Sequence, residues 1–398
     1  MDGYTETYKR LGKIFSLDAT ERIKQSGISF RTFGFSSEFT RHLPDSSDIP
    51  AMERDFLTSC PDTDISENID FRYPVFLPQT YRQTNRAIIL LHGLNEKSWD
   101  KYLPWARELV LRTGHAVILF PISFHMNRSP SEWIEPRNMA GLSRLRENKY
   151  NDQECSTFAN AAISERLDNM PERFALSGFQ SIMDLLNLVN HISSGKHPLF
   201  KEDAEIHFFG YSIGAFLAQV LMIANPEGIF NKSRFVLFAG GTVFSHINGI
   251  SKYILDKHAF EQLRKYYLNQ SSWRRHTLDA YVKAMNVKNI ARAFMAMLSP
   301  EYFNSLRESV FSDFSDRMLV YAMKEDKVFP EKHIMENFSR SGVWVNQLDF
   351  PYDYTHETPF PVSADPALSN KVDQSFDMLF KEIGHFLRDE SNYDFSGF

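Results

Sequence analysis

The stretch AEIHFFGYSIGAFLAQVLMIA, Ala204 to Ala224, joins two apolar segments through the turn Gly-Tyr-Ser-Ile-Gly. The first segment has the pattern of a buried strand and the second that of a helix, so the turn converts one directly into the other. A serine at such a point is forced into unfavourable backbone angles, and Gly210 and Gly214 remove side chains that would clash with the turn. We therefore expect the hydroxyl of Ser212 to stand exposed at the carboxyl end of a sheet, at the N-terminus of a helix.

Apolar segments of the same kind lie on both sides of this turn. Strands are predicted at residues 71–78, 86–93, 115–123, 234–241, 317–323 and 343–350. Helical spacing of apolar residues predicts helices at 99–114, near 179–192 and at 376–387. Near-continuous apolar strands that alternate with amphipathic helices predict an α/β fold, with a mostly parallel central sheet and helices on both faces.

Three regions fall outside this alternation. Residues 1–70 are interpreted as an N-terminal extension with some helix, packed on the main body, and residues 42–50 as a loop within it. The main domain, residues 71–398, is interrupted by insertions at about 124–173 and 242–312, and the second insertion has helical periodicity. Because both insertions follow predicted strands, they begin near the carboxyl edge of the sheet, where we expect them to form a lid or cap.

The composition narrows the class of protein. Hydrophobic residues make up 43% of the 398 residues, enough for a large core, and the net charge of −6 argues against nucleic acid as a partner. Two cysteines make no disulfide framework and indicate either a reducing compartment or a protein indifferent to redox conditions. The first residues lack the pattern of a secretory signal, and no long apolar run predicts a transmembrane segment, so we expect a cytoplasmic protein.

Neither a metal nor a nucleotide cofactor is predicted. The sequence has no His-Glu-x-x-His and no paired Cys-x-x-Cys, which are ligand patterns of common zinc sites. It also has no Gly-x-Gly-x-x-Gly and no phosphate-binding Gly-Lys-Ser/Thr loop. The sequence leaves the oligomeric state open.

The strand, the Gly-x-Ser-x-Gly turn and the helix together resemble the nucleophile elbow of the α/β-hydrolase superfamily. The resemblance covers about Phe71 to the C-terminus, apart from the two insertions. It implies that a nucleophile, an acid and a histidine follow one another in this chain order, with Ser212 as the nucleophile.

The acid is expected just after the strand that follows the second insertion, where MLVYAMKEDKVFP provides Asp326. Asp326 lies four residues before Pro330, as in the family pattern, although Met323 stands where the family often has glycine. Glu325 is interpreted as a surface neighbour, and a solvated charged turn is the alternative for the whole stretch.

The histidine is expected after the last predicted strand, and His356 lies there, one helix and one strand beyond Asp326. Many relatives have glycine before this histidine, and this chain has Thr355. Only His356 has the place that the chain order requires. The other candidates lie within predicted helices, strands or the second insertion and are interpreted as structural: His207, His246, His258 and His385.

An oxyanion hole needs two backbone N–H donors aimed at the developing negative charge. The resemblance assigns one donor to Ile213, directly after the nucleophile, and the other to Leu94, in the loop after the strand at 86–93. His92, which precedes this loop, is expected to brace it rather than to transfer a proton.

Four further residues are candidates for the substrate pocket: Asn95, Tyr211, His125 and Arg128. His125 and Arg128 begin the first insertion and could meet a polar or anionic substrate group, with bracing of the loop by hydrogen bonds as the alternative. The apolar residues of the second insertion could line a pocket or pack among their own helices.

These residues predict a serine hydrolase that cleaves a small-molecule carboxylic ester or acyl compound through an acyl-enzyme. In this mechanism His356 is the base that activates Ser212, and Asp326 orients His356. Two alternatives stay open. The same three residues could act on a peptide or a thioester, or the chain could be a non-catalytic binding protein on a hydrolase scaffold.

Overall fold

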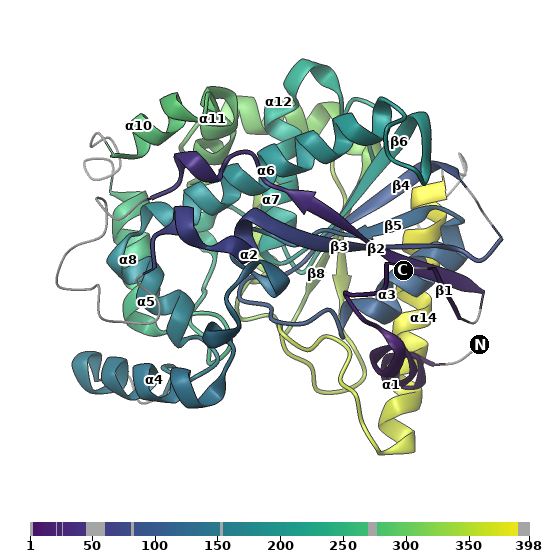
Figure 1. Ribbon diagram of the computed structural model, residues 1–398, viewed down its shortest axis with the longest axis horizontal. Coiled ribbons are helices and arrows are strands. Elements are labelled where there is room, and N and C mark those ends of the chain that lie inside the picture. The colour runs from purple at the N-terminus through teal and green to yellow at the C-terminus, as the bar shows by residue number, and fades with distance from the viewer. Residues whose placement is uncertain are drawn as a thin grey trace.

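The computed structural model describes residues 3–20, 22–25, 27–44, 60–80, 83–151, 154–269 and 277–388. The loop predicted at residues 42–50 lies mostly outside these ranges. In the described part, one sheet crosses the molecule in the strand order β1-β2-β3-β5-β4-β6-β7-β8-β9 (Figure 1).

The sheet is mostly parallel, as predicted. Its strands are β1 (Ile23–Gln25), β2 (Ile28–Ser36), β3 (Asp70–Pro78), β4 (Thr84–Leu91), β5 (Ala116–Leu119), β6 (Phe200–Tyr211), β7 (Phe235–Phe238), β8 (Met318–Met323) and β9 (Val345–Leu348). Strands β5, β4, β6, β7, β8 and β9 run parallel, whereas β1, β2 and β3 form antiparallel pairs at one edge. The carboxyl ends of the parallel strands therefore meet at one edge of the sheet.

Side chains of the central strand β4 point alternately into two cores, because successive residues of a strand face opposite sides of the sheet. Ile88 and Leu90 share one core with helices α3 (Tyr102–Thr113) and α14 (Pro366–Arg388). Ile89 and Leu91 share the other with helices α6 (Glu172–Ser193) and α7 (Ile213–Ala224). The predicted arrangement of helices on both faces is confirmed (Figure 1).

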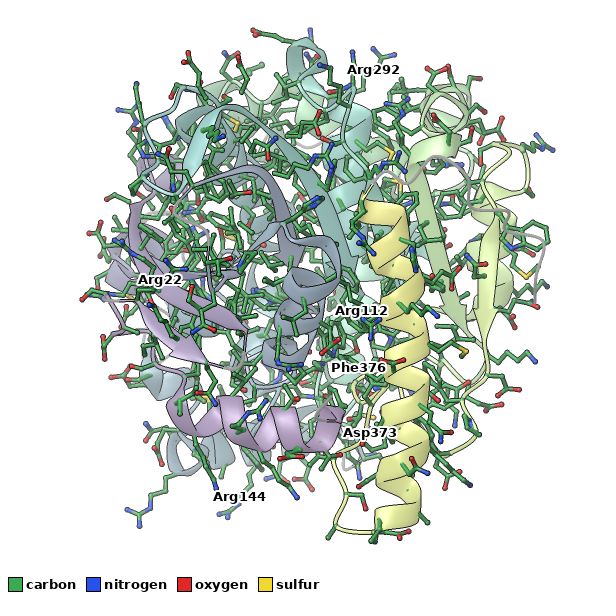
Figure 2. The ribbon with its side chains drawn as sticks, turned by 90° about the vertical axis from the view of Figure 1, so that its right-hand side faces the viewer. Arg22, Arg112, Arg144, Arg292, Asp373 and Phe376 are labelled. Carbon is green, nitrogen blue, oxygen red and sulfur yellow. The ribbon has the colours of Figure 1, made fainter. Side chains whose placement is uncertain are left out.

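The first seventy residues contribute more to this fold than the sequence predicts. Helix α1 (Tyr4–Ile14) packs on α14, where the ring of Tyr4 lies 4.8 Å from that of Phe376 (Figure 2). Strand β2, however, is a full member of the sheet and pairs with β3 along all its nine residues. The sheet thus begins well before residue 71, the predicted start of the main domain.

The two insertions are largely helical and are joined to each other. The first contains α4 (Pro136–Tyr150) and α5 (Ala161–Asn169), and the second contains α8 (Lys257–Leu268), α10 (Thr277–Ala284), α11 (Lys288–Ala296) and α12 (Asn304–Asp313). Two further helices are α2 (Ser66–Ile69) and α13 (Glu331–Phe338). Buried Arg146 on α4 contacts both carboxylate oxygens of Asp256, which caps α8, at 2.5 and 3.1 Å. Helices α4, α5 and α8 consequently gather on one side of the molecule, away from α14 (Figure 1).

Buried histidines make the stability of this fold sensitive to acid. Burial lowers the pKa of His115 to about 3 and those of His125, His197 and His207 to about 4. These values lie below the ordinary value near 6.5, so the unfolded chain binds more protons than the native one between about pH 4 and 6.5. Their stabilising contribution is therefore complete above about pH 6.5 and is lost as the pH falls through that window.

We expect the free energy of unfolding to fall by about 2 kcal/mol per buried histidine between pH 7 and pH 5. The variant His115→Leu tests this cleanly, because Nδ1 of His115 is buried without a hydrogen-bond partner in the described part of the chain. Urea unfolding at pH 5, 6 and 7 should show a shallower pH dependence for the variant by about that amount. Identical slopes for the two proteins would contradict the assignment.

Candidate active site

Ser212 occupies a strained turn between β6 and α7. Its backbone angles are φ 59° and ψ −122°, a left-handed conformation that costs free energy for any residue other than glycine. A Cβ atom on Gly210 would lie 2.6 Å from Cα of Ala215, and one on Gly214 would lie 2.3 Å from the carbonyl oxygen of Leu91. Both glycines are therefore required by close backbone approach, as the clash predicted for side chains at these two positions implies.

Three side chains from separate loops meet at this turn. Ser212 Oγ lies 2.7 Å from Nε2 of His356, and Nδ1 of His356 lies 2.7 Å from Oδ2 of Asp326. Asp326 follows β8 and His356 follows β9, so both come from the carboxyl edge of the sheet. All three residues are nearly buried, with exposures of 3%, 4% and 4% for Ser212, Asp326 and His356. The structure brings the predicted residues into contact, while their catalytic role stays a prediction.

The backbone around Asp326 fixes its carboxylate. Oδ1 accepts hydrogen bonds from the N–H groups of Val328 at 2.8 Å and Phe329 at 2.9 Å, which leaves Oδ2 to face the imidazole. An ionised carboxylate can only accept, so Nδ1 of His356 carries the proton. The lone pair of Nε2 then faces the hydroxyl of Ser212, as the removal of a proton requires.

The imidazole of His356 is held between two aromatic rings. Its centroid lies 5.6 Å from the ring of Tyr211 and 5.4 Å from that of Phe329, and both rings are nearly parallel to it. The hydroxyl of Tyr211 also donates to the carbonyl oxygen of His356. Tyr211 is buried and contacts His356 through its ring and its hydroxyl, and its predicted place at a substrate pocket stays a prediction.

The two predicted oxyanion donors border one cavity. Within the described residues, the backbone N–H groups of Leu94 and Ile213 have no hydrogen-bond acceptor. Ile213 is the first residue of α7, where backbone N–H groups are free and the helix dipole favours negative charge. Both residues line a cavity of about 40 Å³, named here the near cavity, whose other walls are mostly apolar: Phe174, Phe179, Phe216, Leu217 and Phe294.

His92 braces the loop that carries Leu94. Nδ1 of His92 lies 2.8 Å from the carbonyl oxygen of Gly93, and Nε2 accepts from the N–H of Ile122 at 2.9 Å. Burial lowers the pKa of His92 well below its ordinary value, so the ring is neutral and serves as a fixed hydrogen-bonding bridge. The predicted bracing role is confirmed.

Asn95 connects the same loop to both insertions. Its Nδ2 donates to the carbonyl oxygen of Ala159 in the first insertion at 2.8 Å and to that of Tyr253 in the second at 2.6 Å. Asn95 also lines a second cavity of about 40 Å³, named here the far cavity, which adjoins the near cavity through Leu94, His125 and Phe174. Its predicted place at the pocket therefore stays a prediction, alongside a structural role.

Arg128 is not available to a substrate, so its predicted pocket role is corrected. The side chain is fully buried and pairs with Oδ2 of Asp184 at 2.8 Å. Its other donors reach Oδ1 and the carbonyl oxygen of Asn68 and the carbonyl oxygen of Pro121. The guanidinium thus braces the start of the first insertion, the alternative that the sequence left open.

His125, in contrast, lies where a ligand can reach it. It lines both the near and the far cavity. Nδ1 lies 2.9 Å from the carbonyl oxygen of Ser123 and so carries the proton, whereas Nε2 is buried without a partner in the described part of the structure. Burial lowers the pKa of His125 to about 4, which leaves the ring neutral at pH 7.

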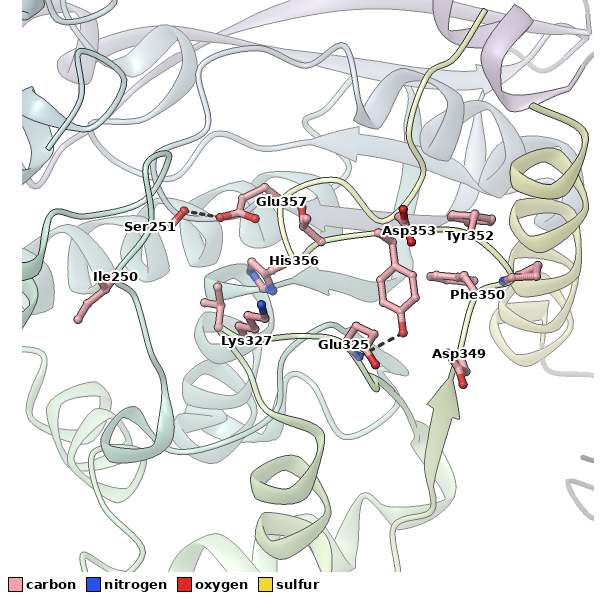
Figure 3. A pocket seen from close by; sticks show the side chains of 14 residues that line it. Ile250, Ser251, Glu325, Lys327, Asp349, Phe350, Tyr352, Asp353, His356 and Glu357 are labelled. Atoms are coloured by element: carbon pink, nitrogen blue, oxygen red, sulfur yellow. Dashed lines mark hydrogen bonds between the residues drawn. The ribbon is translucent and has the colours of Figure 1, made fainter. Parts of the chain in front are cut away.

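Residues that the sequence does not single out connect the histidine loop to its surroundings. Lys101 pairs with Glu96 and donates to the carbonyl oxygen of Glu357 at 3.0 Å. The carboxylate of Glu357 accepts from Ser251 at the start of the second insertion (Figure 3). The two contacts of Glu357 join segments more than a hundred residues apart, so no local motif could reveal them.

Two larger hollows flank the site. A groove of about 690 Å³ lies along the histidine loop, is lined by His356 and Lys327, and includes neither Leu94 nor Ile213 (Figure 3). A second cavity, of about 440 Å³, is lined by Leu94 and, from α1, by Tyr4. The N-terminal helix therefore borders the approach to the oxyanion loop, a role that the sequence did not indicate.

The other histidines have separate surroundings. His258 stacks on Tyr150 at 3.6 Å, and Nδ1 of His207 accepts from the N–H of Arg234.

His246, His333 and Glu336 form a group whose ligand atoms all lie within 4.8 Å of one another. Two imidazoles and a carboxylate are a donor set that divalent zinc accepts, so these residues are the ones that could hold a metal in the described part of the chain.

The strand order, the elbow after β6, and the placement of the acid after β8 and the histidine after β9 together form the α/β-hydrolase arrangement. The resemblance drawn from the sequence is confirmed at the level of the fold. Within the described residues, no helix combines the length and apolar character needed to cross a membrane.

Solved structures with a similar fold include three enzymes. A thermostable esterase from Pseudomonas putida is 13% identical, with a TM-score of 0.45 over 92% of this chain and 86% of the esterase. Carboxyl esterase 2 from the fungus Tuber melanosporum is 9% identical, with a TM-score of 0.43 over 96% and 97% of the two chains. An acylaminoacyl peptidase from Pyrococcus horikoshii is 12% identical, with a TM-score of 0.45 over 96% of this chain and 45% of the peptidase. Likenesses this remote identify neither a substrate nor a mechanism.

A comparison with curated protein sequences found no match. The sequence model described as "Family of unknown function (DUF6051)" matches residues 1–388, which includes both insertions and the strands before residue 71. The protein therefore belongs to the DUF6051 family.

Proposed function

We propose that the protein is a serine hydrolase that cleaves a carboxylic ester through an acyl-enzyme. The observation that carries this proposal is the continuous set of contacts from Ser212 Oγ to His356 Nε2, and from His356 Nδ1 to Asp326 Oδ2, each at 2.7 Å. A serine hydroxyl is a weak nucleophile at neutral pH and needs an adjacent base that is itself oriented. The three side chains supply the nucleophile, the base and the orienting acid.

In the first half of the reaction, Ser212 Oγ attacks the ester carbonyl carbon while His356 takes its proton. The N–H groups of Leu94 and Ile213 stabilise the oxyanion, each by about 3–4 kcal/mol. His356 then gives its proton to the departing alkoxide, and the alcohol leaves an acyl group on Ser212. In the second half, His356 removes a proton from water as its oxygen attacks the acyl carbon. The bond between the acyl carbon and Ser212 Oγ then breaks, His356 returns the proton to Oγ, and the carboxylic acid is released.

The near cavity is the best place for the acyl group, because the two oxyanion residues form part of its wall. Its volume of about 40 Å³ has room for only a few non-hydrogen atoms, since one water needs at least about 10–15 Å³ by the same measure. The groove along the histidine loop is larger but lacks both oxyanion residues. A short acyl group is therefore expected, with the two insertions acting as a cap over it.

The experiment that tests this function is a substrate panel with the purified full chain. We expect hydrolysis of p-nitrophenyl acetate and butyrate, with kcat/KM falling by about tenfold or more for the octanoate, because its chain exceeds the cavity. Assays with an acyl thioester and with an N-acetyl amino-acid amide test whether the protein cleaves thioesters or peptides instead. A correctly folded protein that hydrolyses none of the esters would contradict the proposal.

Gly178 on α6 lines the near cavity and offers a graded test of its size. A Cβ atom there would lie 3.9 Å from Cδ1 of Leu217, an ordinary contact. Gly178→Ala should raise the free energy of unfolding by about 0.5–1 kcal/mol, because glycine is unfavourable within a helix. The added methyl group should also lower the ratio of butyrate to acetate hydrolysis.

Gly141→Ala is the matched control for this prediction. Gly141 lies within α4, and a Cβ atom there would have no neighbour within 4 Å. The control should gain a similar stability in urea unfolding while its butyrate-to-acetate ratio stays that of the unmodified protein. An equal change of this ratio in both variants would show that the near cavity does not hold the acyl group.

A further inference from the structure

The near cavity and the far cavity have linings of different charge. In the near cavity, which contains Ile213, the lining is apolar apart from Ser177 and His125. The adjoining far cavity does not reach Ile213, and three cationic side chains line it: Lys97, Arg166 and Arg173. Among the described residues, no carboxylate belongs to that lining. A ligand that runs from Ser212 through both cavities would therefore pass from an apolar wall to a positively charged one.

Both arginine side chains of the far cavity are held in place by ion pairs with Asp62. Arg166 Nη2 lies 2.6 Å from Oδ1 of Asp62, and Nε of Arg173 lies 3.1 Å from each carboxylate oxygen of the same residue. Asp62 is itself buried, and the guanidinium of Arg166 also stacks on the ring of Trp133 at 4.4 Å. The cationic end of the far cavity is thus a rigid part of the protein rather than a set of mobile surface side chains.

Lys97 adds a third cation to the lining of the far cavity, and it also lines the cavity of about 440 Å³ that Leu94 borders. In the described part of the chain, its ammonium group makes no ion pair and no hydrogen bond, although the residue is half-buried. Burial lowers the pKa of Lys97 to about 8, with the nearby Glu96 opposing this shift. A half-buried ammonium group without a partner costs free energy, which a bound anion would offset.

His125 lies between the two cavities and can adjust to such an anion. Its Nε2 has no partner in the described structure and carries a lone pair, since Nδ1 is bonded to the carbonyl oxygen of Ser123. A negative charge in the cavity would raise the pKa of this imidazole and favour uptake of a proton at Nε2. The ring then donates to the anion instead of repelling it.

We propose that the acyl group of the substrate ends in a carboxylate, which binds to Lys97 in the far cavity. This inference rests on the proposed ester hydrolysis. The substrate class is a monoester of a short dicarboxylic acid, because two cavities of about 40 Å³ each leave room for a chain of roughly four carbons. Water cleaves the single ester bond, and the products are the dicarboxylate, one alcohol and one proton.

The test compares two esters of matched shape: monoethyl succinate, and ethyl 4-methylpentanoate, in which an isopropyl group replaces the carboxylate. Release of ethanol gives kcat/KM for each. We expect the full-length protein to prefer the succinate by about 10- to 100-fold, as a charged hydrogen bond warrants. Lys97→Met, which keeps the apolar stem of the side chain, should lower this ratio by at least about tenfold.

Lys327→Met is the matched control. Lys327 lies beside His356 and lines the groove along the histidine loop but not the far cavity, so its loss removes one positive charge near the site without changing the far cavity (Figure 3). The ratio of the two esters should stay unchanged in this variant. An equal fall in both lysine variants would overturn the inference and indicate a general electrostatic effect.

The outcomes separate the inference from the function on which it rests. Hydrolysis of both esters at similar kcat/KM by the unmodified protein would overturn the carboxylate site and leave the serine hydrolase standing. If neither ethyl ester is hydrolysed, the p-nitrophenyl ester panel decides the proposed function, and calorimetry with Ser212→Ala decides the carboxylate site alone. Monoethyl succinate should then bind to Ser212→Ala and bind at least tenfold more weakly when Lys97→Met is added. Equal binding by the two proteins would overturn the inference.

Discussion

Replacing Ser212 with alanine is expected to lower kcat for ester hydrolysis by about 10⁵- to 10⁶-fold. The substitution removes the only atom that can attack the carbonyl, while the oxyanion donors Leu94 and Ile213 remain and retain a small residual rate. The fold should be unaffected, because the Oγ atom bonds only to His356 within the described residues and alanine keeps the same Cβ at the strained turn. Kinetics with p-nitrophenyl acetate and thermal unfolding measure the two effects.

Ser233→Ala provides the comparison for this result. Ser233 is similarly buried, at 4% exposure, and lies just before β7, outside the contacts that join Ser212, His356 and Asp326. Its kcat should stay within about twofold of the unmodified protein. A Ser212→Ala variant that keeps more than a tenth of the turnover would remove Ser212 from the mechanism.

Asp326→Asn is expected to lower kcat by about 10⁴-fold with little change in stability. The side-chain oxygen of asparagine can still accept from the N–H groups of Val328 and Phe329, so its NH₂ group would face Nδ1 of His356. Two donors cannot bond to each other, and the imidazole would have to move its proton to Nε2. Nε2 could then no longer accept the proton of Ser212.

The neighbouring Glu325 supplies the control for this variant. Glu325 is exposed and lines the groove, and its backbone N–H, which the substitution keeps, donates a hydrogen bond to the hydroxyl oxygen of Tyr354 at 3.2 Å. Glu325→Gln should therefore change kcat by no more than about threefold in the same ester assay. A larger loss of kcat in Glu325→Gln than in Asp326→Asn would indicate that Glu325, and not Asp326, is the acid that orients His356.

Much of the core of this fold could be predicted because its signals are local. The turn at Ser212 needs Gly210 and Gly214 for steric reasons that follow from the sequence of the turn itself. The strands at 86–93 and 204–210 are predicted to be buried because nearly all their residues are apolar. The order of nucleophile, acid and histidine then limits the partners to one loop each. Asp326 and His356 could be selected in this way, although Met323 and Thr355 depart from the family pattern.

Features that depend on distant partners could not be predicted. Strand β2 is antiparallel, lies near the edge and has buried polar residues such as Ser29 and Thr32, so only its pairing with β3 shows that it belongs to the sheet. Arg128 is of a residue type that often binds ligands. Its guanidinium can be buried because it pairs with Asp184, which lies 56 residues away in the chain. The unpartnered state of Lys97 likewise depends on which side chains surround it, and no pattern in the sequence contains that information.

The central claim is that His356 activates Ser212 as a nucleophile. Reaction of the purified protein with a fluorophosphonate probe, followed by mass spectrometry of the intact chain and its peptides, tests this claim most directly. The account predicts one adduct per chain, located on Ser212, formed at a much reduced rate in Asp326→Asn and absent from Ser212→Ala. A folded protein that forms no adduct, or a Ser212→Ala variant labelled as fast as the unmodified protein, would contradict it.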